Sequence, residues 1–508
     1  MKNALTGVRT RFKQTATPLA MDWILLCAVL FMMFISYIYN DLIITAGHSL
    51  DVWDSIVRGQ FINFYSFDFG ARSLPAYDFP IYVIFAVWNL PMWILRYFFG
   101  VDVLSSAFCL SYMKLMLLMF LAGSAWVLRK ICVEMKMPSE NIKWVTFLFL
   151  SSGFVMSSLF VMTQYDIVMV FFLLIGLLMY IKNRIPAFLV FFSIAVSMKM
   201  FALMAFVPLV LLKEKRAVRI FLYTAASVGV TVVSKLLFML DSDHGVNRYV
   251  RGISHSGLAS RMILSSELPI GPSGIFVYIA LFLALCVYCY VKTPVLEHEL
   301  HAYSMYIPLL SFSLFLLLCS AHPYWFIMTT PFLPVIMLRD GGKLKINMML
   351  DSIVMIFMLI HSQISNRSTW KIDLMHSAVV SKIFGAVEIM KFPYSVGAFY
   401  DDILEKMKVS YRVVAFYEDA SWRGAVNFTM VTETVSVVEI VLGTVFFAAM
   451  AAVLVLNFPK SKEPTKEPEP VVIERSVVWV RLLAPAVLCL LPVGLYIMSV
   501  FVHGLYNT

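Results

Sequence analysis

The sequence predicts an all-α, polytopic transmembrane protein with about 11–13 spanning helices and interfacial helices in the first outer loop. Hydrophobic residues make up 61% of the 508 positions, charged residues 14%, and the mean hydropathy is +0.84, whereas soluble domains are about half apolar and a quarter charged. The apolar residues form runs long enough to cross about 30 Å of hydrocarbon. Inside lipid the backbone must satisfy its own hydrogen bonds, so such runs form helices.

The positions of lysine and arginine set the expected topology. The net charge is +9, but the basic residues lie in short clusters between apolar runs, which is typical of cytoplasmic anchors and not of nucleic-acid binding. The first apolar run, 21–39, follows a basic segment without acids, is too long for a signal peptide and lacks a small-residue cleavage site. We therefore expect a retained first span with the N-terminus in the cytoplasm.

Ten further apolar runs are expected to span the membrane: 103–128, 143–160, 163–181, 217–239, 272–292, 301–319, 323–338, 344–361, 432–456 and 478–501. Two other stretches do not fit a simple crossing. Residues 79–99 contain two prolines and, as a span, would place the basic loop 129–143 outside, so we expect one or two interfacial helices there. Residues 185–212 have basic clusters on both flanks, which predicts two bent half-helices that meet near Lys199.

The chain divides into regions by these patterns. We expect residues 1–340 to form one transmembrane module that carries the candidate functional residues, and residues 341–456 to add further spans around a long outer segment, 362–430, with short surface helices. Residues 457–477 contain a stretch with four prolines and alternating lysine and glutamate, which predicts a flexible cytoplasmic linker. Residues 478–508 carry the last span.

The first outer loop holds one group of candidate functional residues. His48, Asp51 and Asp54 follow the first span closely, and Tyr77 and Asp78 come later in the loop. A carboxylate just above the membrane can take a proton from an incoming hydroxyl, which is the work of a general base. The alternative is that these acids are solvated or cap a surface helix.

Three more groups carry polar or ionisable residues at the ends of apolar segments. Gln164 and Asp166 begin a span, where an acid also suits the helix dipole. Lys199 lies between the half-helices, where an anionic phosphate would be its natural partner unless the side chain snorkels to the interface. His322 and Tyr324 lie at the mouth of another span, where they could bind a sugar or a phosphate or only anchor the interface.

Under the expected topology, all four groups lie on the outer side of the membrane. The outer loop 240–270 adds Arg248 and Arg251, which could hold phosphate or simply be solvated. This convergence predicts one outward-facing site built from segments that are far apart in the sequence.

Several of these features occur together in one known class of enzymes. In chain order they are the acids of the first outer loop before Gly59, Tyr77-Asp78-Phe79-Pro80, Gln164 and Asp166, Lys199 before Pro208 and the basic residues 213–216, and His322-Pro323-Tyr324 leading to Pro331. This combination resembles the GT-C class of membrane glycosyltransferases, which take sugars from polyprenyl-phosphate carriers. In particular it is similar to the bacterial mannosyltransferase-like branch related to the GPI mannosyltransferases. The resemblance covers about residues 20–340, and the first loop departs from it by lacking an Asp-x-Asp or Asp-Glu pair.

The resemblance implies an inverting sugar transfer in which an acid of the first outer loop is the base. In this sequence that role falls first on Asp54, with Asp51 and Asp78 as alternatives. The candidates for binding the donor phosphate are Lys199, His322, Arg248 and Arg251. The candidates for binding substrate are His48, Tyr77, Gln164, Asp166 and Tyr324.

The expected partners are a polyprenyl-phosphate-linked sugar, a glycan, lipid or protein acceptor, and membrane lipids. The sequence requires no cofactor and holds no GxGxxG motif or P-loop, although the acids could hold a divalent cation. The expected location is the bacterial plasma membrane, with the active site on the outer face. The alternatives are a lipid-linked polysaccharide polymerase or flippase, which also combines many spans with outer basic residues, and a partner subunit without catalysis.

Overall fold

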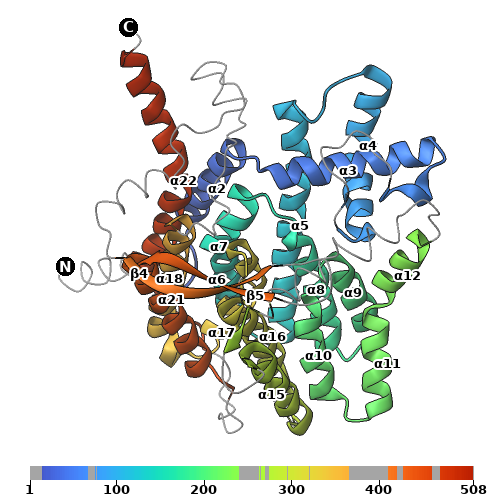
Figure 1. Ribbon diagram of the computed structural model, residues 1–508. Coiled ribbons are helices and arrows are strands. Elements are labelled where there is room, and N and C mark those ends of the chain that lie inside the picture. The colour runs from blue at the N-terminus through green and yellow to red at the C-terminus, as the bar shows by residue number, and fades with distance from the viewer. Residues whose placement is uncertain are drawn as a thin grey trace.

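The computed structural model describes residues 14–66, 75, 77–239, 263, 265–268, 274–294, 296–319, 321–364, 410–419, 427–459 and 469–506. Helices dominate this part of the chain, and its strands form three small antiparallel pairs. In Figure 1 most helices run side by side in one bundle, whereas α3 lies across the direction of α5. The predicted helical class is confirmed.

Five stretches of the described chain are long and apolar enough to cross a membrane. They are α4 (Phe79–Phe99), α5 (Ala107–Glu134), α6 with α7 and η2 (Ser139–Leu150, Gly153–Val155 and Met156–Val161), α16 (Glu297–Leu318), and η4 with α18 (Gly341–Lys343 and Leu344–Ile364). Two bent pairs raise the number to seven if each is one span. They are α2 with α3 (Ala20–Ser36 and Asn40–Val57) and α11 with α12 (Ala217–Ser227 and Gly229–Phe238). These helices are compatible with an integral membrane protein.

The remaining helices include several that are shorter than a membrane is thick. They are α8 (Asp166–Ile181), α9 (Ile185–Met198), α10 (Ala202–Lys213) and α15 (Val277–Val291), whereas α21 (Val437–Leu456) has 20 residues and α22 (Arg475–Tyr506) has 32. The described residues therefore hold five to seven stretches that are long and apolar enough to span a membrane, and the 11–13 spans expected for the whole chain stay a prediction. Several other apolar runs in the described residues fold as helices of 10–17 residues.

The span expected at 323–338 is wrong. This segment forms η3 (Pro323–Thr329), a turn, and the short α17 (Phe332–Met337). Pro331 and Pro334 have no N–H to donate, which removes hydrogen bonds that a continuous helix would need. The segment is buried from residue 325 onward, so it fills the interior of the bundle and faces other helices.

The half-helices expected within 185–212 are confirmed. α9 ends at Met198 and α10 begins at Ala202, and Lys199 between them has extended dihedrals of φ −152° and ψ 127°. α9 packs along α8, and α10 packs against α15 and α16. The break therefore carries Lys199 into the interior, where its side chain is buried.

Residues 79–99 form one continuous helix, α4, which packs against α3. Pro80 lies in its first turn, where a missing N–H costs little, and Pro91 lies inside the helix without ending it. The length and hydropathy of α4 suit a span as well as an interfacial helix. Its expected position in the interface stays a prediction.

The strands join segments that lie outside the bundle helices. β1 (Gln14–Thr15) pairs with β6 (Ile473–Glu474), so the N-terminal part of the described chain meets the end of the expected linker. β2 (Glu267–Leu268) pairs with β3 (Ile275–Phe276), and η1 (Phe61–Asn63) follows α3. Within the expected outer segment, 362–430, residues 365–409 lie outside the described residues. What the structure describes next is the pair β4 (Ser410–Asp419) and β5 (Asn427–Ser436), where helices were expected.

Candidate functional site

Lys199 lies at the centre of the candidate site. Its ammonium forms an ion pair with the carboxylate of Asp166 at the start of α8, and the two residues are 5% and 0% exposed. The ammonium also lies near three ring centroids, at 4.9 Å from Tyr165, 5.2 Å from Trp325 and 6.0 Å from Tyr324. A buried lysine needs such partners, because an unpaired charge in a low-dielectric interior is costly. Two residues predicted from distant segments are thus in direct contact.

Aromatic rings extend the site on both sides of this ion pair. The ring of Tyr77 packs edge-to-face on that of Tyr165, with centroids 4.9 Å apart. His322 stacks on Tyr324 with centroids 5.1 Å apart, and its ring lies 5.0 Å from that of Trp325. The loop before α4, the start of α8 and the η3 turn therefore meet around the α9–α10 break.

Asp41, which the sequence analysis did not select, belongs to the same group. It lies in the first turn of α3, and Gln164 Nε2 donates a 2.8 Å hydrogen bond to its Oδ2. Burial, and next the Asp41 carboxylate, raise the pKa of Tyr77 well above its usual range. Burial and the Lys199 ammonium lower the pKa of His322, while Asp41 opposes that shift. The charge of Asp41 therefore influences both Tyr77 and His322.

We call this group the Lys199 cluster. Its members are Asp41, Tyr77, Gln164, Tyr165, Asp166, Lys199, His322, Tyr324 and Trp325. The sequence does contain a signal for Asp41, since it is the first acid after the first apolar run and begins a helix, where the dipole favours a carboxylate.

A buried lysine fixes the bend that presents Asp41. Lys114 Nζ on α5 donates hydrogen bonds to three backbone carbonyls, those of Phe34 at 3.1 Å, Tyr37 at 2.7 Å and Phe160 at 3.0 Å. Two of these carbonyls end α2 and the third lies in η2, so one ammonium joins the bend between α2 and α3 to the segment before α8. Helix ends leave carbonyls without intrahelical partners, which is why a cation suits this position.

The loop that leads into α8 holds the same bend from the other side. Thr163 Oγ1 accepts a 3.0 Å hydrogen bond from the backbone N–H of Tyr39, just before α3 begins. Thr163 has φ +44°, a left-handed conformation that β-branched residues rarely adopt. Such strained residues persist only where their surroundings hold them, and they gather at functional sites. Thr163 thus holds the backbone just before α3, and its neighbour Gln164 holds the side chain of Asp41.

The acids selected from the sequence lie elsewhere, in what we call the Arg96 cluster: His48, Asp51, Asp54, Trp93 and Arg96. Asp54 Oδ1 accepts a 2.7 Å hydrogen bond from Trp93 Nε1, and its Oδ2 accepts one from the guanidinium of Arg96. The guanidinium also lies 3.9 Å from Asp51, and His48 Nδ1 lies 3.7 Å from the Asp51 carboxylate. Both oxygens of Asp54 are therefore already bonded, on a residue that is 6% exposed.

The two clusters are separated along α3. At 1.5 Å per residue, the helix rises about 20 Å from Asp41 to Asp54 and about 15 Å from Asp41 to Asp51. A single sugar does not bridge such a distance. His48 is linked to the Lys199 cluster through Tyr82. The ring of His48 packs on that of Tyr82, whose hydroxyl accepts a 3.0 Å hydrogen bond from the backbone N–H of Tyr77.

The remaining predicted residues are Asp78, Arg248 and Arg251. Asp78 directly precedes α4, and its carboxylate lies 3.9 Å from the ammonium of Lys235 on α12. Arg248 and Arg251 lie outside the described residues. Among the residues that are described, no group of three or more histidines, cysteines or acids is arranged to hold a metal ion.

Comparisons with family models, with curated proteins and with solved structures find no match for this chain.

Proposed function

We propose that the protein is a GT-C-like membrane glycosyltransferase that takes a sugar from a polyprenyl-phosphate carrier and transfers it, with inversion, to an acceptor on the outer face of the membrane. The observation that carries this proposal is the Lys199 cluster. Five segments separated by up to about 280 positions meet there, and four of them carry residues that were candidates on their own chemistry. The site combines a carboxylate, a buried ammonium and aromatic rings.

Asp41 is the proposed base, in place of Asp54. A general base must reach the hydroxyl whose proton it removes, and it must have a lone pair to accept that proton. Asp41 is half-buried within the cluster and accepts a hydrogen bond from Gln164. Asp54 is tied by Trp93 and Arg96 and lies about 20 Å away along α3.

Lys199 is the proposed contact for the departing phosphate. An ammonium aimed at the position where negative charge develops stabilises the transition state more than the ground state. Asp166 holds Lys199 in place but also cancels its charge, and Asp41 adds a second carboxylate. A phosphate therefore needs more positive charge than these three residues supply. We assign that contribution to Arg248 and Arg251, which follow α12 in the chain.

The aromatic rings of the cluster are the proposed sugar contacts. Tyr77, Tyr165 and Tyr324 combine an apolar ring face with a hydroxyl, which suits a sugar ring with its alternating C–H and O–H groups. His322 stacks on Tyr324 and presents ring nitrogens to the same space.

The test uses the full chain in lipid nanodiscs with a panel of polyprenyl-phosphate monosaccharides. The proposal expects release of polyprenyl phosphate and a product whose anomeric configuration is inverted, as read by nuclear magnetic resonance. A product with retained configuration would exclude the inverting mechanism. Movement of a lipid-linked oligosaccharide across the bilayer, or its extension block by block, without use of any monosaccharide donor would favour a flippase or a polymerase instead.

A further inference from the structure

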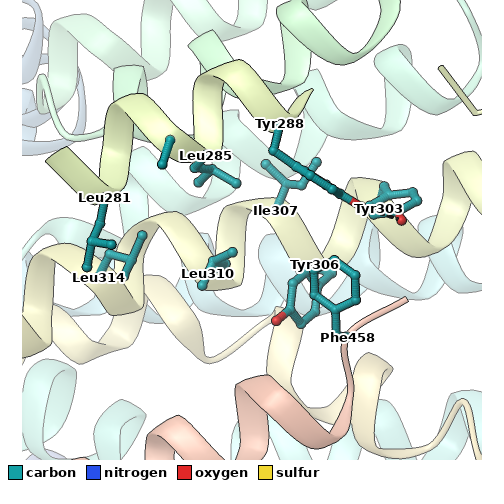
Figure 2. Close-up of a pocket in the computed structure, with 10 residues that line it drawn as sticks. Leu281, Leu285, Tyr288, Tyr303, Tyr306, Ile307, Leu310, Leu314 and Phe458 are labelled. Atoms are coloured by element: carbon teal, nitrogen blue, oxygen red, sulfur yellow. Dashed lines mark hydrogen bonds between the residues drawn. The ribbon is translucent and has the colours of Figure 1, made fainter. Parts of the chain in front are cut away.

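A groove lies between α15 and α16, and one of its lining residues, Leu314, precedes Phe315, whose ring stacks at 6.1 Å on Trp325 of the Lys199 cluster. Its volume is about 250 Å³. Figure 2 shows Leu281 and Leu314 at one end and Tyr288, Tyr303 and Phe458 toward the other. The groove therefore runs along the two helices from an aliphatic end to an aromatic end.

The polar atoms of the groove wall are already satisfied. The hydroxyls of Tyr288 and Tyr303 bond to one another at 2.7 Å, and Tyr303 also donates to the carbonyl of Pro459 at 3.3 Å. Tyr306 donates to the carbonyl of Leu454 at 2.8 Å. The wall thus presents hydrocarbon and ring faces to an occupant. A polar ligand would lose its hydrogen bonds to water there without gaining new ones, whereas an alkyl chain has no hydrogen bonds to lose.

The surroundings of the groove indicate where such a chain comes from. Leu283 and Val287 on α15 are 58% and 62% exposed, so the helix that forms one wall also presents an apolar face to the outside. In a protein with several apolar helices of spanning length, that face meets lipid. A lipid chain can therefore enter the groove from the membrane without crossing water.

The aromatic end of the groove is basic. Lys215 Nζ donates to the carbonyls of Cys289 and Lys292, both at 2.8 Å, and so joins the end of α10 to the end of α15. Lys292 Nζ lies 5.5 Å from the ring centroid of Tyr303 and pairs with Glu299. The neighbouring Arg216 is exposed. Basic residues between helices at the cytoplasmic end of a span attract anionic headgroups.

We infer that this groove binds one acyl chain of an anionic phospholipid, with the chain between α15 and α16 and the phosphate beside Lys292 and Arg216. The inference rests on the membrane location of the chain and not on sugar transfer. It assigns the aliphatic end of the groove to the chain terminus and the basic end to the headgroup.

The test uses a photoreactive phospholipid with a diazirine in its acyl chain, added to the full chain in nanodiscs, followed by peptide mapping. The expected labels fall on 281–288 and 303–314. Ala284→Trp fills the groove, and labelling there should fall about tenfold or more because the chain loses its apolar contacts. Leu283→Trp is the matched control, since Leu283 precedes Ala284 on α15 but is exposed and does not line the groove, and this variant should label like the unchanged protein.

The headgroup is tested by competition. Phosphatidylglycerol should displace the probe more effectively than phosphatidylcholine, and Arg216→Gln should reduce that difference. Labelling that is unaffected by Ala284→Trp would overturn the site. Equal displacement by both phospholipids would overturn the headgroup assignment. Stronger displacement by a polyprenyl phosphate would give the groove to a different lipid and would also contradict the inference. None of these readouts depends on sugar transfer.

Discussion

Gln164 donates a 2.8 Å hydrogen bond to Asp41, which joins the loop before α8 to the first turn of α3 across 123 positions of the chain. The contact fixes the orientation of a carboxylate that would otherwise turn freely at a helix start. The backbone of the same two segments is joined by the bond from Tyr39 to Thr163. Two neighbouring residues of one loop thus fix both the path of the backbone into α3 and the orientation of the proposed base's side chain.

Replacing Lys114 should loosen this arrangement. Lys114→Met leaves three buried carbonyls without a donor, so we expect a loss of about 2–4 kcal/mol of stability and a lower unfolding temperature. Lys130→Met is the matched control, because Lys130 is exposed on the same helix, α5. Thermal unfolding followed by tryptophan fluorescence measures both. Equal unfolding temperatures for the two variants would mean that Lys114 does not hold the bend.

The ion pair between Lys199 and Asp166 should behave as a unit. Lys199→Met leaves a buried carboxylate alone, and Asp166→Leu leaves a buried ammonium alone, so each should cost about 3–5 kcal/mol. The double variant removes both charges, and we expect it to be less destabilised than the sum of the two single variants. A double-mutant cycle from denaturant unfolding measures this coupling. Simple additivity would show that the two charges do not depend on one another.

The stability of the protein should depend on His322 at mildly acidic pH. Burial and Lys199 lower the pKa of His322 in the folded state, whereas in the unfolded chain it is about 6.5. The unfolded state therefore binds the proton more readily, and stability falls as the pH drops below about 6.5 toward the folded value. His322→Gln should flatten this fall in unfolding temperature between about pH 7 and 5. His298→Gln, at an exposed position, should leave it unchanged. An equal slope in all three proteins would contradict the assignment.

Asp54 should contribute to stability more than to chemistry. Asp54→Asn keeps the shape of the side chain but weakens the bonds to Trp93 and Arg96, so we expect a loss of about 1–3 kcal/mol. Sugar transfer per folded molecule should change little. The comparison is made between unfolding temperature and the rate of transfer at a temperature where the variant is folded. A rate that falls sharply without any loss of stability would return Asp54 to the role of base.

Much of the site could be predicted from the sequence, because charge placement is a local signal. The basic clusters on both flanks of 185–212 were sufficient to predict the break at Lys199, and the apolar runs were sufficient to predict the helical class. The choice between Asp41 and Asp54 could not be made in this way. It depends on Arg96, which comes 42 positions after Asp54 and binds it only because α4 packs on α3.

The number of spans could not be set from composition alone, for a related reason. Apolar composition does not distinguish a helix that crosses lipid from a segment that is buried among other helices. The prolines of 323–338 did carry a usable signal, since a proline inside a helix removes a hydrogen bond. Pro91 shows that this signal is not sufficient, because α4 continues through it.

We propose Asp41 as the catalytic carboxylate. The most direct measurement is single-turnover sugar transfer by Asp41→Asn and Asp54→Asn in nanodiscs, each compared with Asp102→Asn at an exposed loop position. We expect Asp41→Asn to lower the rate by about 100-fold or more while folding is unchanged, and the other two variants to transfer at close to the normal rate. A normal rate for Asp41→Asn together with an inactive but folded Asp54→Asn would contradict it.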